Sequence, residues 1–173
     1  MLTLNQLAPI FATLDGKTFD APYEKALRNL ASRQFLPPTE VRGRNFHFDR
    51  AAVATIWLAH TAAKFGVPRL TIDVLAQWLG SASTRLEEVE GGQVAISRAA
   101  EALQRVEAGE VFSLSIVLPA DNRLRIVADW TPDEAPSARV SALLDARLAP
   151  EVARFSLPAS ALIGKLLLAL PQD

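Results

Sequence analysis

The segment that decides the fold of the N-terminal half reads YEKALRNLASRQFLPP over residues 23–38 and VRGRNFHFD over residues 41–49. The first part has apolar residues at helical spacing, and Pro37 and Pro38 end it because proline cannot continue a helix. A glycine between two arginines and a short run of alternating aromatics follow, which is typical of a β-hairpin. Asp49 then stands where a side chain would cap another helix. The segment therefore predicts a helix, a basic hairpin and a second helix.

Helical patterns lie on both sides of this segment. Residues 4–12 carry apolar side chains at helical spacing after an N-capping threonine. Asp20 and Pro22 mark the start of the next helix, since aspartate caps a helix and proline is tolerated in its first turn. Two further amphipathic helices are predicted over residues 50–65 and 71–79. The connection between the first two helices is long, so the sequence leaves their relative placing open.

The pattern changes beyond residue 83. Apolar residues at helical spacing predict a helix over residues 84–108, broken or kinked at Gly91 and Gly92. Strict alternation over residues 110–118 and a second run over residues 124–130 predict a pair of β-strands.

Two more helices are expected, over residues 137–148 and 159–170. The last of these is apolar on almost every side. It is therefore predicted to lie at the centre of its own core or against another chain, and the second possibility suggests a homodimer.

These elements predict an α+β protein with an N-terminal domain over residues 1–80 and a C-terminal domain over residues 84–173. The expected boundary is the small polar stretch at residues 81–83, and charge balance changes sign across it. The first 80 residues hold nine basic and six acidic side chains, whereas the remainder holds nine basic and thirteen acidic ones. A basic head on an acidic body is typical of a nucleic-acid-binding module joined to a partner or dimerisation domain.

Several classes of function have no support in the sequence. The chain has no cysteine and two histidines, which excludes a cysteine-based zinc site. Glu87, Glu88 and Glu90 lack a further ligand at metal-binding spacing and are expected on a solvated, kinked helix. No catalytic arrangement and no nucleotide-binding glycine pattern emerge. We therefore expect no enzyme, cofactor or metal, and, without a leader or a membrane-spanning run, a cytoplasmic location.

Polar side chains on the first basic helix and the hairpin are the candidates for DNA contact. Arginine and asparagine can each form two hydrogen bonds to base edges, which suits Arg28, Asn29, Ser32 and Arg33 for the major groove. Residues near a helix start commonly contact phosphates. The complete expected set is Tyr23, Lys25, Arg28, Asn29, Ser32, Arg33, Arg42 and Arg44.

Residues 4–79 resemble the DNA-binding head of MerR-type transcriptional regulators, whose second helix runs into a leucine-proline-proline and then a wing. The motif here is Leu36-Pro37-Pro38 followed by Arg42-Gly43-Arg44. The resemblance implies a winged helix-turn-helix, homodimeric binding to double-stranded DNA at promoters, and RNA polymerase as a further partner. The C-terminal half departs from the single long helix of that family, and a phage or mobile-element regulator fits equally well.

Two other functions stay open at this point. The basic helix could bind an acidic protein, which would make the chain a protein–protein interaction adaptor. Alternatively, Phe112, Ile116 and Trp130 could line a pocket in the C-terminal half, which would make it a small-molecule sensor.

Overall fold

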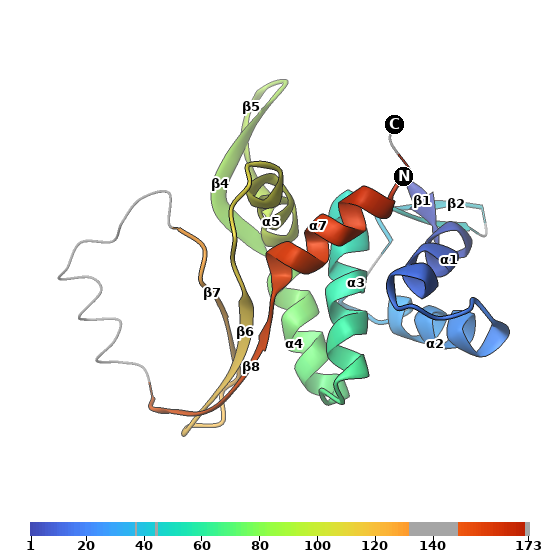
Figure 1. The fold of residues 1–173 in the computed structure, drawn as a ribbon. Helices are drawn as coiled ribbons and strands as arrows, with labels where there is room; N and C mark the ends of the chain where they lie inside the picture. The colour runs from blue at the N-terminus through green and yellow to red at the C-terminus, as the bar shows by residue number, and fades with distance from the viewer. Residues whose placement is uncertain (37, 44, 132–148, 172–173) are drawn as a thin grey trace.

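A computed structural model describes residues 1–36, 38–43, 45–131 and 149–171 (Figure 1). It confirms the expected mixture of helices with small antiparallel sheets. The N-terminal elements follow the predicted order and are β1 (Leu2–Thr3), α1 (Leu4–Leu14), α2 (Ala21–Ala31), β2 (Glu40–Arg42), β3 (Asn45–Phe48), α3 (Arg50–Lys64) and α4 (Arg69–Gly80).

The predicted caps fix where these helices begin. The Asp20 carboxylate accepts a hydrogen bond from the backbone N–H of Tyr23 at 2.8 Å, at the start of α2. The Asp49 carboxylate accepts one from the backbone N–H of Ala52 at 2.7 Å, at the start of α3. Each cap satisfies a backbone donor that has no partner within its own helix.

The hairpin of β2 and β3 is extended by β1, which the sequence pattern does not predict because two residues are too few to show an alternation. The strand order is β1-β3-β2, and all pairs are antiparallel. Phe48 is buried at the inner end of the hairpin, whereas Val41 and Phe46, a cross-strand pair further out, are about half exposed. Only the inner end of the expected apolar face therefore reaches the core.

The helix expected over residues 84–108 is wrong in its first half. Residues 82–97 form a hairpin of β4 (Ala82–Val89) and β5 (Gly92–Ser97), and only α5 (Arg98–Glu107) is helical. Gly91 and Gly92 have φ angles of 102° and 147°, a region that glycine enters readily, so they reverse the chain where a kink was expected. The hairpin stands out from the body of the molecule (Figure 1).

The second predicted strand pair is confirmed and gains a third member. It consists of β6 (Leu114–Pro119) and β7 (Arg125–Ala128), and β8 (Glu151–Leu157) adds to the other edge to give the order β7-β6-β8. The sequence pattern did not predict β8. The helix expected over residues 137–148 lies outside the described residues.

The last helix, α7 (Ala159–Ala169), packs into the chain's own core against α1, α3 and α5 (Figure 1). Ala159, Ile163 and Leu166 are fully buried, whereas Leu168 points outward and is 86% exposed. The indole N–H of Trp57 in α3 donates to the carbonyl of Leu162 in α7 at 3.2 Å. Elements from both sides of residues 81–83 thus contribute to a single hydrophobic core.

The three residues expected to line a ligand pocket in the C-terminal half are packed instead. Phe112 and Ile116 are buried, and the ring of Trp130 meets Phe112 edge-on and stacks on Trp78. The guanidinium group of Arg105 covers the Trp130 ring at 4.9 Å from its centre. These residues thus pack against one another and against Trp78 and Arg105, and a small-molecule sensor stays a prediction.

Candidate nucleic-acid interface

One face of α2 is polar and open to solvent because the other face is buried. Leu27, Leu30 and Ala31 lie in the core at helical spacing. The opposite side carries exposed side chains that the sequence singled out as DNA contacts, namely Lys25, Arg28, Asn29 and Ser32. Arg28 forms an exposed ion pair with Glu24 one turn earlier. Such a pair is weak, so Arg28 can exchange Glu24 for another partner.

The hairpin of β2 and β3 supplies a second basic element. Gly43 turns the chain at its tip with a φ of 62°, and Arg42 before it is exposed and lies 2.8 Å from the Glu40 carboxylate. The hydrogen bond from Arg42 holds the pKa of Glu40 below its usual value, so that pair is formed at neutral pH. Arg44 lies outside the described residues.

A cavity of about 470 Å³ lies where α1, α2 and β3 meet, and its lining joins the two basic elements. Its polar side chains are Asn5 from α1, Arg28 from α2, Asn45 from β3 and Thr3 from β1, and Leu4 and Phe46 complete the lining. The sequence pattern did not identify Asn5 or Asn45, because neither is basic and neither lies on the helix expected to read bases. Their types are suited to hydrogen bonding with bases or phosphates.

Tyr23 does not belong to this surface. Its hydroxyl turns inward and donates to the Asp15 carboxylate at 2.8 Å, with the His60 ring nitrogen 3.2 Å away. Burial, followed by the charge and hydrogen bond of Asp15, raises the pKa of Tyr23. The structure therefore removes Tyr23 from the candidate contacts.

Arg33 is also turned inward. Its guanidinium group meets both carboxylate oxygens of Asp73 in α4 at 3.0 Å and donates to the backbone carbonyl of Arg69 at 2.8 Å. Only 7% of the Arg33 side chain is exposed. This bidentate contact holds α2 against α4, so Arg33 supports the interface from within and does not take part in it.

The long connection between α1 and α2 is tied down by Asp15, whose side chain is 2% exposed. Besides Tyr23, its carboxylate bonds the His60 ring at 2.7 Å and the Lys64 ammonium at 2.5 Å, both from α3. Burial would raise the pKa of Asp15, but these three hydrogen bonds together lower it, so the group is ionised at neutral pH. The cluster fixes α2 relative to α1 and α3, and His60 is a hydrogen-bonded member of it.

The described part of the chain forms neither a metal site nor a membrane-spanning helix. Glu87 and Glu88 lie exposed on β4 and Glu90 follows in the turn, so the three stand on a hairpin where a helix was expected. Among residues 1–36, 38–43, 45–131 and 149–171, no group of acidic or histidine side chains could hold a metal ion. Within the same ranges, every helix is too short or too polar to cross a lipid bilayer.

No family model, curated protein or solved structure matches this chain significantly. The assignment of a function therefore depends on the arrangement of the side chains themselves.

Proposed function

We propose that this protein binds double-stranded DNA as a transcriptional regulator, with α2 in the major groove and the hairpin of β2 and β3 against the backbone. The observation that carries the proposal is the cavity at which Asn5, Arg28 and Asn45 converge, between an exposed polar helix face and a basic hairpin. The resemblance of residues 4–79 to MerR-type heads supports the same assignment. In this arrangement Arg28 and Asn29 read bases, while Lys25 and Arg42 contact phosphates.

Substitutions on α2 should separate base reading from phosphate binding. Arg28→Ala is expected to weaken binding to the preferred duplex by about 1–3 kcal/mol, since it removes a side chain able to form two hydrogen bonds to guanine. Lys25→Ala should weaken binding to all duplexes equally and lower the slope of affinity against salt by about one. Fluorescence anisotropy titrations of labelled duplexes at several salt concentrations measure both effects.

Lys165→Ala is the matched control for Lys25→Ala. Lys165 is likewise an exposed helical lysine, but it lies on α7. If Lys165→Ala lowers affinity as much as Lys25→Ala, binding depends on overall charge and not on the α2 face, and the proposal fails.

A protein partner is the second candidate function, and one observation favours it. The outer end of the hairpin exposes Val41 and Phe46 as a cross-strand apolar pair, and Phe46 also lines the cavity beside Arg28. Glu24 and Glu40 also neutralise part of the positive charge on this face. An apolar pair rimmed by charge is common at protein interfaces. Absence of salt-sensitive retention on heparin or duplex DNA would favour this alternative.

The homodimer and RNA polymerase partners belong to the proposal as implications of the resemblance, as does a cytoplasmic location. α7 is buried within the chain's own core, so its apolar character alone is not evidence for a homodimer. A regulator that reads two half-sites would still need two heads about one helical turn apart on DNA.

A further inference from the structure

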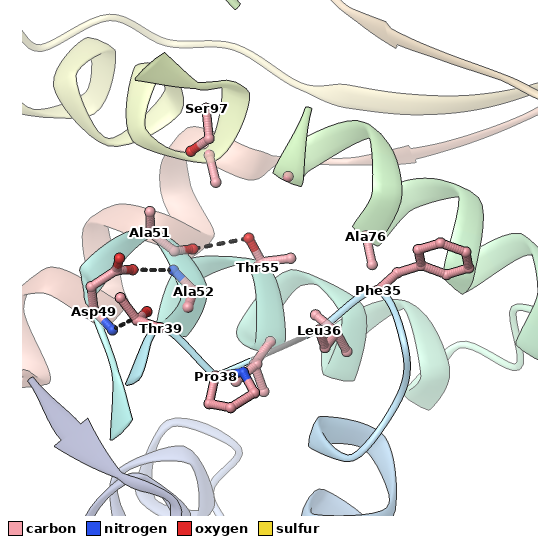
Figure 2. Close-up of a pocket in the computed structure, with 13 residues that line it drawn as sticks. Phe35, Leu36, Pro38, Thr39, Asp49, Ala51, Ala52, Thr55, Ala76 and Ser97 are labelled. Atoms are coloured by element: carbon pink, nitrogen blue, oxygen red, sulfur yellow. Dashed lines mark hydrogen bonds between the residues drawn. The ribbon is translucent and has the colours of Figure 1, made fainter. Parts of the chain in front are cut away.

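A second cavity, of about 250 Å³, shares no lining residue with the first (Figure 2). Its walls come from the first two turns of α3, the first turn of α5, the last turn of α4, and four residues between α2 and the hairpin, namely Phe35, Leu36, Pro38 and Thr39. The cavity therefore lies where the N-terminal helices meet the segment that positions the hairpin.

The cavity exists because small side chains meet at this junction. Ala51 and Ala52 from α3, Ala76 and Gly80 from α4, and Ala99 from α5 line it. Larger apolar residues complete the wall, among them Phe35 and Ile56. An apolar cavity of smaller size in another protein binds benzene, so this space can hold a molecule the size of two fused rings.

The polar groups in the wall are almost all occupied. The Thr39 hydroxyl accepts from the backbone N–H of Asp49 at 3.0 Å, and the Thr55 hydroxyl donates to the Ala51 carbonyl at 2.9 Å. The Ser97 hydroxyl caps α5 by accepting from Ala100 at 3.1 Å. Figure 2 shows these side chains around the cavity.

One acceptor is left over. One oxygen of the Asp49 carboxylate caps α3, and the other accepts no hydrogen bond from the part of the chain that the structure describes. A neutral N–H or O–H donor suits this oxygen better than a cation does, because the positive ends of α3 and α5 both face the cavity.

We propose that this cavity binds a compact, neutral, largely apolar ring compound that donates one hydrogen bond to Asp49. Such a ligand would contact Phe35, Thr39 and the first turn of α5 at once. The binding site is independent of the proposed DNA-binding function, and its test requires no DNA.

Indole is a suitable probe because it combines an apolar double ring with a single N–H donor, and indene has nearly the same shape without the donor. Titration of the full chain, followed by two-dimensional NMR, is expected to give saturable shifts at residues lining the cavity. The expected Kd for indole is about 1 mM, as befits a small ligand. Indene should bind roughly tenfold more weakly, the effect of one hydrogen bond to a charged acceptor.

Two variants locate the site. Ala52→Leu fills the cavity from its half-buried rim and should abolish binding of both compounds. Asp49→Asn keeps an oxygen for the helix cap but replaces the free acceptor, so it should weaken indole about tenfold and leave indene unchanged. Ala63→Leu, at an exposed position of α3 away from this cavity, should change neither. Absence of saturable indole binding by the wild type overturns the proposal, as does binding that survives Ala52→Leu in a folded chain.

Discussion

Replacing Leu166 with aspartate is expected to abolish cooperative folding of the whole chain, including the helices at its N-terminus. Leu166 is fully buried in α7, in the core that α7 shares with α1, α3 and α5. The substitution removes about 1.5–3 kcal/mol of apolar burial and adds the larger penalty of a charge without a partner. Together these approach the total stability of a typical domain, about 5–15 kcal/mol. Thermal melting followed by circular dichroism measures the loss.

Leu168→Asp provides the matched control, two positions further along the same helix. Leu168 is 86% exposed, so the substitution should change stability by no more than about 0.5 kcal/mol. The same reasoning predicts that a fragment of residues 1–80 will not melt cooperatively, because it lacks the helices that cover α1 and α3. If that fragment folds and melts in a single transition, residues 81–83 are a true domain boundary and the shared core is not essential.

The second large effect is expected from Arg105→Leu. Arg105 is 2% exposed, bonds Glu101 in its own helix at 2.7 Å and Glu110 at 2.8 Å, and donates to the backbone carbonyl of Thr131. Its removal leaves the buried Glu101 carboxylate without its main partner. Breaking a buried pair in this way typically lowers the free energy of unfolding by about 3–5 kcal/mol, which urea denaturation would detect.

Two comparisons sharpen that prediction. The double variant Glu101→Leu with Arg105→Leu should recover much of the loss, since no charge remains at the centre of the pair. Arg154→Ala removes an exposed pair with Glu151 and should leave the urea midpoint nearly unchanged. If Arg105→Leu lowers the urea midpoint no more than Arg154→Ala does, the buried network does not stabilise the fold.

The difference in the free energy of unfolding between the wild type and Arg105→Leu should also be smaller in acid than at neutral pH. Burial would raise the pKa of Glu110, but the hydrogen bonds from Arg105 and Thr131 lower it overall. A carboxylate with a lowered pKa stabilises the folded state fully above its unfolded pKa of about 4.3 and loses that effect as pH falls through its folded value. Urea denaturation of both proteins below about pH 4 should therefore show a smaller gap than at neutral pH.

The sequence was most informative where local chemistry decides the structure. The caps at Asp20 and Asp49 and the helical spacing of apolar residues predicted the starts of α2 and α3, and the bounds of α1, α3, α4 and α7 to within about two residues. The end of α2 was predicted wrongly, because the helix stops at Ala31 and not at the proline pair. The failure at residues 84–97 has a physical cause. The spacing of Leu86, Val89 and Val94 fits a helix, but all three are exposed on a hairpin, where no core requires that spacing. Gly91 and Gly92 decide the turn.

The exposed residues of the candidate interface could be predicted from the sequence, but the inward orientation of two expected members could not. Helical periodicity correctly set Lys25, Arg28 and Asn29 apart from the buried face of α2. It could not identify Tyr23 and Arg33 as inward, because their partners Asp15 and Asp73 belong to other elements, and Asp73 is 40 residues away in the chain. A short β1 and the strand β8 were missed for the same reason, since each exists only through pairing with a distant strand.

The central claim, that α2 and the adjacent hairpin form a DNA-binding surface, is tested most directly by selection of bound duplexes from a random pool with the full chain. We predict enrichment of a defined sequence, and an affinity for it whose logarithm falls linearly with the logarithm of the salt concentration. The Arg28→Ala protein should lose that enrichment while keeping its melting temperature. Failure of the wild type to enrich any duplex, or enrichment of the same duplex to the same extent by Arg28→Ala, would contradict the claim.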